Sequence, residues 1–248
     1  MVGPTIFVIV ITLVATTVRT RPPAGSGSTV AEAASALPGL EVDAALRGRS
    51  FWLIGLAQFC FAFAASGTNL HAIPYFIGIG YGGARAALFM SLVLGIAGAG
   101  KLGMGLLADR IGARRALVLN FLLCACGMVS LLFAANAAAA AAFLVVYGLT
   151  VGAPLTLVPL VMADSLGLRR FGSLSGLVGL FNILGGAAGP VVAGRIFDVT
   201  GSYAAAFEAF ALALLLGAAA SAGCVPLGAA APREPARVAS RAEDVAGA

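Results

Sequence analysis

Lys101 is the residue of this chain whose type and position most directly suggest chemistry. It is the only charged residue between Arg85 and Asp109, in a run of apolar and small residues. An ionisable side chain inside a membrane-spanning helix costs several kcal/mol unless it faces a cavity or a partner. Lys101 therefore indicates a functional cavity. The alternative is a lysine that extends its ammonium group to the membrane surface.

Polar side chains also recur in other apolar stretches. Gln58 and Asn69 lie on one face of a predicted helix, as a narrow polar stripe that would line the same cavity. Tyr147 and Asn182 stand in two further apolar stretches. Each of these four residues is a candidate substrate contact, and for each the alternative is a hydrogen bond between neighbouring helices.

The sequence contains no set of residues that is suited to enzyme catalysis or to metal binding. His71 is the single histidine, so a Ser-His-Asp set is not plausible, and the four cysteines lie in apolar runs without metal-ligand neighbours. Residues 95–101 match the first seven positions of a P-loop but lack the following Ser or Thr that would hold magnesium. We therefore predict that the protein is not an enzyme and uses no cofactor and no metal.

The composition places these residues in a membrane. Of the 248 residues, 60% are hydrophobic and 10% are charged, and the mean hydropathy is +1.03. Soluble domains carry roughly 25% charged residues. The apolar runs are also long enough, at about 20 residues, for membrane-spanning helices. The composition therefore predicts an all-α membrane protein.

The arginines divide the chain into membrane-spanning pairs. They form four clusters, at residues 47–49, 110–115, 169–170 and 233–241, and each interval between clusters has room for two spans and a turn. By the positive-inside rule these clusters are cytoplasmic, so the net charge of +5 marks orientation and does not indicate a nucleic-acid partner. The spacing predicts six spans, at about residues 50–72, 84–108, 115–135, 139–163, 172–197 and 203–225.

The remaining segments complete the predicted organisation. Residues 1–18 contain an apolar stretch that is too short to span and is followed by arginines, which favours the end of a truncated transmembrane helix over a signal peptide. Residues 19–49 are rich in Pro, Gly, Ser and Ala and are expected to form a flexible cytoplasmic linker. Residues 50–227 are predicted to form the six-helix bundle, and residues 228–248 a disordered cytoplasmic tail.

One motif is specific enough to indicate a family. Residues 105–115 read Gly-Leu-Leu-Ala-Asp-Arg-Ile-Gly-Ala-Arg-Arg. This segment closely resembles the signature loop GxxxDRxGxRR of the major facilitator superfamily of transporters, with Ala113 at the variable position before the last two arginines, where the family usually has arginine. A glycine at its start permits close helix approach, a second suits the turn, and the acid accepts hydrogen bonds from a neighbouring helix N-terminus. The alternative is an ordinary positively charged loop. The matching positions are Gly105, Asp109, Arg110, Gly112, Arg114 and Arg115.

A second resemblance covers the end of the fifth span. Gly189, Pro190, Gly194 and Asp198 lie in a segment similar to helix 11 of the monocarboxylate-porter and oxalate/formate-antiporter-like branch of that superfamily. The proline is expected to kink the helix, and Arg195 and Asp198 to form a local ion pair. The whole likeness runs from about residue 50 to residue 225. It implies helices 7–12 of a twelve-helix transporter, preceded by the end of helix 6.

The resemblance also implies a function. Lys101 precedes Gly105 by four residues, where the monocarboxylate-porter branch has an arginine that binds the substrate carboxylate, so Lys101 is implied to bind an anion. We expect the C-terminal half of a secondary active transporter in the plasma or inner membrane, moving a small organic anion such as a monocarboxylate by alternating access. Its partners would be the lipid bilayer, the anion, and an N-terminal six-helix half or a second copy. The alternative is a transport-incompetent half-bundle, serving as a membrane interaction subunit or surviving as a gene remnant.

Overall fold

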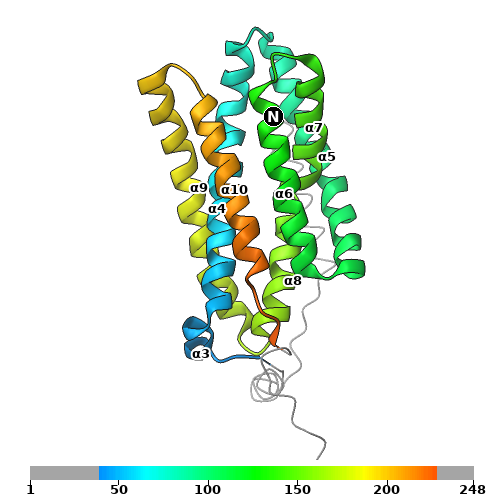
Figure 1. Ribbon diagram of the computed structural model, residues 1–248, viewed down its shortest axis with the longest axis vertical. Coiled ribbons are helices and arrows are strands. Elements are labelled where there is room, and N and C mark those ends of the chain that lie inside the picture. Colours follow the sequence, from blue (N-terminus) through cyan, green and yellow to red (C-terminus); the bar gives the residue numbers. More distant parts are fainter. Residues whose placement is uncertain (1–38, 228–248) are drawn as a thin grey trace, which may run out of the picture. The chain divides into compact units, whose positions relative to one another are not determined.

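The computed structural model describes residues 39–227, which form one helical bundle (Figure 1). The predicted helix end at residues 1–18, most of the linker and the tail at residues 228–248 lie outside the described residues. Within residues 39–227, six segments are helical, long and apolar enough to cross a membrane. The predicted all-α membrane bundle of six spans is therefore confirmed.

The helices follow one another with short links. In chain order they are α3 (Val42–Arg47), α4 (Arg49–Gly78), α5 (Gly83–Ile111), α6 (Ala113–Leu132), α7 (Ala137–Val151), α8 (Pro154–Leu166), α9 (Phe171–Thr200) and α10 (Ala204–Ala222). Helices α7 and α8 together make the fourth span. Successive spans run in opposite directions (Figure 1).

All the described arginine clusters lie at one end of the bundle, which we call the arginine-rich end. The start of α4, the α5–α6 turn, the α8–α9 turn and the end of α10 meet there, at the bottom of Figure 1. The predicted spacing of three arginine clusters by pairs of spans is therefore correct, and the fourth cluster lies outside the described residues. The arginines at this end are Arg47, Arg49, Arg110, Arg114, Arg115, Arg169 and Arg170.

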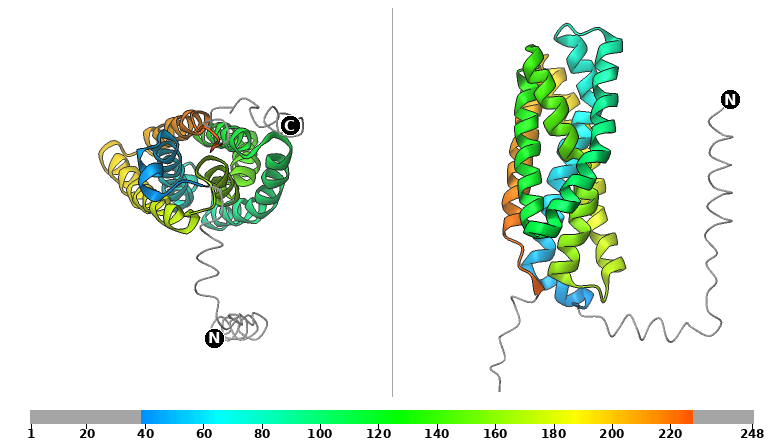
Figure 2. Two further views of the ribbon diagram at one scale, coloured as in Figure 1. Left: turned by 90° about the horizontal axis from the view of Figure 1, so that it is seen from below. Right: turned by 90° about the vertical axis from the view of Figure 1, so that its right-hand side faces the viewer.

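The packing of the helices follows a twofold pattern. Helix α4 packs chiefly on α9 and α10, α7 packs on α5 and α6, and α6 packs on α10. The six spans form two successive units of three, α4 to α6 and α7 to α10. The first span of each unit thus contacts the second and third spans of the other unit, as inverted repeats do. Helices α5 and α9 lie on the two flanks, while α6 and α10 form one face (Figures 1 and 2).

Glycines allow the tightest contacts between these helices. A Cβ added at Gly100 would overlap the carbonyl of Leu149, and one added at Gly185 would overlap the carbonyl of Phe59. Helices in lipid associate through close van der Waals contact, which small residues permit. The glycines therefore set the positions of α5 against α7 and of α9 against α4.

The helix boundaries differ from the prediction in two places. Helix α4 continues through Pro74 to Gly78, so the first link is residues 79–82 and not the longer stretch predicted at 73–83. A proline is tolerated in a membrane helix when neighbouring groups compensate for the freed carbonyl. The fourth span is not one helix, because α7 ends at Val151 and α8 starts at Pro154.

Residues 39–48 are held against the bundle, contrary to the expectation of a flexible linker. The amide of Leu40 donates to the carbonyl of Leu166 at 2.9 Å, and residues 42–47 form α3. The Glu41 carboxylate lies 3.0 Å from Nε of Arg169 and accepts a hydrogen bond from Nε of Arg170 at 2.9 Å. These contacts attach the segment before α4 to the turn between α8 and α9.

Candidate functional site

The break in the fourth span is the main irregularity in the membrane-spanning part of the bundle. Pro154 has no N–H to donate to the carbonyl of Thr150, which instead accepts from Ala153 at 3.2 Å. The Thr150 hydroxyl donates back to the carbonyl of Val146 at 2.8 Å. Non-helical backbone at membrane depth is tolerated where it is buried in protein or lines a cavity. The break therefore marks the place in the fold where a cavity is expected.

Helix α5 lies directly against this break. A Cβ added at Gly152 would lie 2.6 Å from the carbonyl oxygen of Ala97, and one added at Gly105 would lie 3.8 Å from the methyl of Thr156. Residues four apart share a helix face, so Lys101 lies between these two contacts and level with the break. Its side chain is exposed in this bundle. Lys101 thus stands beside the break without being buried in the helix packing.

A cleft of about 230 Å³ lies beside α8, between α4 and α9. It brings together Gln58 of α4 with Ser175 and Asn182 of α9, against Pro154 and Pro159 of α8. The Oε1 atom of Gln58 is buried and has no hydrogen-bond partner among residues 39–227. The cleft is therefore lined by neutral polar side chains, one of which carries an acceptor without a partner.

Gln58, Lys101 and Asn182 also lie at a common depth. They are nine, ten and eleven residues from the arginine-rich ends of α4, α5 and α9. At a rise of 1.5 Å per residue these counts place them about 14 to 17 Å from that end. The three predicted contacts thus lie on three helices around α8, at one level of the bundle.

The other two predicted substrate contacts lie elsewhere. Asn69 is exposed, and it is twenty residues from the start of α4 and so about 30 Å along the helix. Tyr147 is completely buried and stacks on Phe143, with ring centroids 4.9 Å apart. The structure does not bring Asn69 or Tyr147 to the cleft.

The signature loop turns at Gly112, whose φ of +88° is one that other residues rarely adopt. Arg114 donates to the carbonyl of Cys224 at 2.8 Å, while Asp109 and Arg110 are exposed. Among residues 39–227 the side-chain carboxylate of Asp109, which lies in α5, forms no hydrogen bond or ion pair, so the expected contact with a helix N-terminus is not seen there. The close approach expected at Gly105 occurs instead at Gly100, five residues earlier.

The helix 11 motif lies in the contact of α9 with α4. A Cβ added at Gly189 would overlap the carbonyl of Phe63. Pro190 cannot donate to the carbonyl of Gly186, and the hydroxyl of Ser66 on α4 donates to that carbonyl at 2.8 Å. Ser66 was not among the residues predicted from the sequence. A proline within a predicted span is the signal to look for a donor on a neighbouring helix.

His71 fixes the same contact nearer the opposite end. Its Nε2 lies 3.0 Å from the carbonyl oxygen of Pro190 and its Nδ1 3.3 Å from the Tyr203 hydroxyl. A Cβ added at Gly194 would lie 3.8 Å from the His71 ring. Burial, with a smaller contribution from the Asp198 carboxylate, raises the pKa of Tyr203. His71 therefore joins α4, α9 and the turn before α10.

The expected ion pair between Arg195 and Asp198 does not form in this structure. Both side chains are exposed, and the ion pairs within residues 39–227 are those of Glu41 with Arg169 and Arg170. Two exposed side chains lose conformational entropy on pairing and gain little in return. A spacing of three residues on an exposed helix end is therefore not sufficient for a pair.

Comparisons with known proteins agree with this architecture. The family profile described as Major Facilitator Superfamily matches residues 1–190 and 94–245. The chain is 28% identical over 162 residues to monocarboxylate transporter 12 of Homo sapiens, a match that covers 63% of this chain and 31% of that protein.

Two solved structures share the fold. The fucose:proton symporter FucP of E. coli superposes with a TM-score of 0.63 at 19% identity, over 73% of this chain and 45% of that one. A FucP structure in the outward conformation gives a TM-score of 0.60 at 19% identity, over 73% of this chain and 44% of that one. The chain thus spans about a third of the length of the monocarboxylate transporter and less than half of the symporter.

The six spans, the broken fourth span and the twofold packing define a multi-pass membrane protein with the fold of half a transporter. The fold and the comparisons are those of transporters and not of enzymes. The family match covers well over half of the sequence, and the chain belongs to the Major Facilitator Superfamily.

Proposed function

We propose that this chain forms the C-terminal half of a secondary active transporter that moves a small organic anion, such as a monocarboxylate, by alternating access. The observation that carries the proposal is the position of Lys101, exposed and level with the break in the fourth span. Broken helices are where transporters of several folds hold substrate and coupling ions. The name of the human relative, a monocarboxylate transporter, supports an anionic substrate.

Lys101 and the cleft on the other side of α8 would together fit a substrate with one charged and one polar part. The ammonium group of Lys101 would bind the carboxylate as a point charge with three donors. Gln58 lines the cleft across α8, and a hydroxyl or amide donor of the substrate would satisfy its Oε1 once a side-chain rotation brings that buried atom to the cleft. Leaving such an acceptor unpaired costs about 1 to 3 kcal/mol, so the pairing favours substrates that carry a donor.

The partner of this bundle is proposed to be an N-terminal six-helix half or a second copy. Only 22% of the residues in the apolar windows of α5 and α9 are buried, against half or more in the other spans. Each flank therefore leaves a long apolar helix for lipid or a second bundle to cover. Rocking of two bundles about the level of Lys101 would open the cleft to each side in turn.

We also propose an orientation and a location. The arginine-rich end would face the cytoplasm in a plasma or inner membrane, with the segment before α4 and the tail after α10 on that side. This orientation can be tested in whole cells with single cysteines placed at Arg85 and at Arg110, on opposite ends of α5. An impermeant thiol reagent then shows which of the two positions is labelled from outside. Labelling of the Arg110 position from outside would reverse it.

Uptake of a labelled three-carbon monocarboxylate, by cells that produce the chain in its natural assembly, tests the site. Lys101→Gln is expected to lower uptake at least about tenfold, since hydrogen bonds to charged groups contribute about 1.5 to 3 kcal/mol. Lys101→Arg keeps the charge and should retain uptake. Arg85→Gln, which removes a cation at the opposite end of α5, is the matched control and should leave uptake unchanged.

The outcome separates this proposal from its alternatives. Normal uptake by Lys101→Gln, at equal amounts in the membrane, would show that the lysine extends to the surface and binds no substrate. A correctly inserted wild-type chain without uptake of any organic anion would favour a half-bundle that serves as an interaction subunit.

A further inference from the structure

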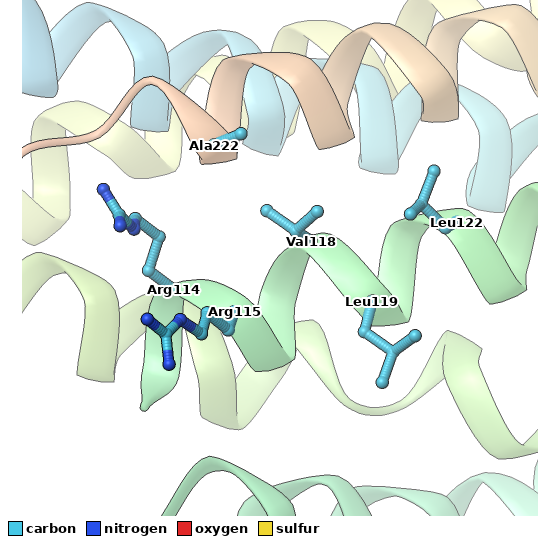
Figure 3. A pocket seen from close by; sticks show the side chains of 6 residues that line it. All are labelled: Arg114, Arg115, Val118, Leu119, Leu122 and Ala222. Atoms are coloured by element: carbon cyan, nitrogen blue, oxygen red, sulfur yellow. The ribbon is translucent and has the colours of Figure 1, made fainter. Parts of the chain in front are cut away.

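A groove of about 270 Å³ lies between α6 and α10 at the arginine-rich end. Figure 3 shows two guanidinium groups at one end of it, with apolar side chains continuing along α6. The groove is therefore cationic where the spans end and apolar further along them. Its lining residues are Arg114, Arg115, Val118, Leu119, Leu122 and Ala222.

The two arginines have capacity for a further ligand. Nη1 of Arg114 donates to the carbonyl of Cys224 at 2.8 Å, which fixes this guanidinium beside the end of α10. A guanidinium has five N–H donors, so one such bond leaves most of them available. Arg115 is exposed, and neither arginine forms an ion pair within residues 39–227. The groove thus carries two adjacent positive charges that the described part of the chain does not neutralise.

The apolar wall is exposed on a membrane-spanning helix, where lipid would contact it. Leu119 is 38% exposed and Leu122 is 42% exposed, on a helix that spans the membrane. The α6–α10 face lies on the other side of the bundle from the α8 cleft (Figure 2). The groove is therefore separate from the proposed substrate site.

A second basic hollow lies on the other side of the end of α10. It has a volume of about 480 Å³ and is lined by Arg47, Arg49, Trp52, Leu53 and Gly223. Trp52 is 55% exposed, and its Nε1 donates to the carbonyl of Leu46 at 2.8 Å. Exposed tryptophans with one polar contact are typical of the headgroup level of a membrane. The arginines of both hollows therefore lie at the depth of lipid headgroups.

We propose that the α6–α10 groove binds an anionic phospholipid, with its phosphate on Arg114 and Arg115 and an acyl chain along Val118, Leu119 and Leu122. Guanidinium groups match phosphate oxygens in geometry and charge. A free anion would use the arginines but not the apolar wall. A peptide would leave backbone polar groups unpaired against the leucines at membrane depth, which is costly. A lipid satisfies both parts of the groove.

Native mass spectrometry of the chain purified in detergent measures this binding without any transport assay. The probes are phosphatidylglycerol and phosphatidylcholine with identical acyl chains. The wild-type chain is expected to bind phosphatidylglycerol more tightly. Arg115→Gln should weaken that binding about fivefold, and the double change with Arg114→Gln about 25-fold, as expected from the attraction of single basic residues to anionic lipid. Arg85→Gln, at the opposite end of the bundle, is the charge-matched control and should have no effect.

Further arms distinguish the lipid from a soluble anion. Leu122→Ser should weaken binding of both lipids while the preference for phosphatidylglycerol remains. Glycerol phosphate, which has the charge but no acyl chain, should not displace the lipid at millimolar concentration. Displacement by glycerol phosphate, equal binding of the two lipids, or an equal loss in Arg85→Gln would each overturn the proposal.

Discussion

The contact of Gly100 with the fourth span can be tested by adding one methyl group. In Gly100→Ala the new Cβ would overlap the carbonyl of Leu149, which belongs to the backbone of another helix and cannot rotate away. Gly98 lies two residues earlier in the same helix, and a Cβ there would meet nothing within 4 Å. Gly98→Ala is therefore a matched control that adds the same methyl group to the same helix.

The difference between the two variants isolates the cost of the collision. Alanine favours a helix over glycine by about 0.5 to 1 kcal/mol, and this gain is common to both changes. Overpacking of a well-packed contact costs about 1 to 3 kcal/mol, and only Gly100→Ala incurs it. For a chain of this size 1 kcal/mol shifts the unfolding midpoint by about 2 to 4 °C. Gly100→Ala should therefore unfold about 2 to 12 °C below Gly98→Ala.

A thiol-reactive fluorogenic dye provides the assay in detergent. Cys60, Cys124 and Cys224 are buried, and Cys126 is exposed. Heating should therefore produce a fluorescence rise when the three buried thiols become accessible. Equal midpoints for the two variants would show that α5 does not lie against Leu149 as described, and the position assigned to Lys101 would lose its support.

Two further predictions concern groups away from the cleft. Asn120 is completely buried, and neither amide atom has a partner within residues 39–227. Burying an amide without a partner costs about 1 to 3 kcal/mol, and Asn120→Leu removes this cost, so it should raise the unfolding midpoint by at least about 2 °C. A lower unfolding midpoint would show that the amide is hydrogen-bonded. The hydrogen bond from Arg170 holds the pKa of Glu41 below its ordinary 4.5. Attachment of residues 39–48 should therefore be complete above about pH 4.5 and be lost as the pH falls through the lower folded-state value. Hydrogen exchange of the Leu40 amide, measured against pH in the wild-type chain and in Glu41→Gln, tests this attachment. The same pH dependence of protection in the two chains would refute the prediction.

The spans were predictable because each depends on a local property. About 20 apolar residues are needed to cross the membrane, and glycine is favoured at the turn of residue 112, so the α5–α6 boundary could be placed within a few residues. The break at residues 152–153 was missed, since a proline in a membrane span can either be tolerated, as Pro74 is, or end a helix, as at Pro154. Local sequence does not distinguish these outcomes, which depend on whether neighbouring helices compensate for the lost hydrogen bond.

The attachment of residues 39–48 was missed for a different reason. Their composition is that of a linker, but Glu41 finds its partners at Arg169 and Arg170, more than 120 residues later. The backbone pairing of Leu40 with Leu166 is equally distant in sequence. Contacts of this kind arise only when α8 and α9 are in place, and composition alone carries no sign of them.

The depth of the candidate site in the bundle could be predicted from the sequence, but the directions in which its side chains point could not. Counting from the arginine clusters places Gln58, Lys101 and Asn182 at one level, because the rise of a helix is constant. Which way a side chain points depends on the rotation of its helix, and contacts with glycines fix that rotation. A Cβ on Gly127 of α6 would lie 2.9 Å from the amide nitrogen of Tyr147, so this tyrosine is turned into the core. From the sequence, Tyr147 and Gln58 were equally plausible substrate contacts. The glycine on a third helix, Gly127, explains why the tyrosine does not reach the cleft.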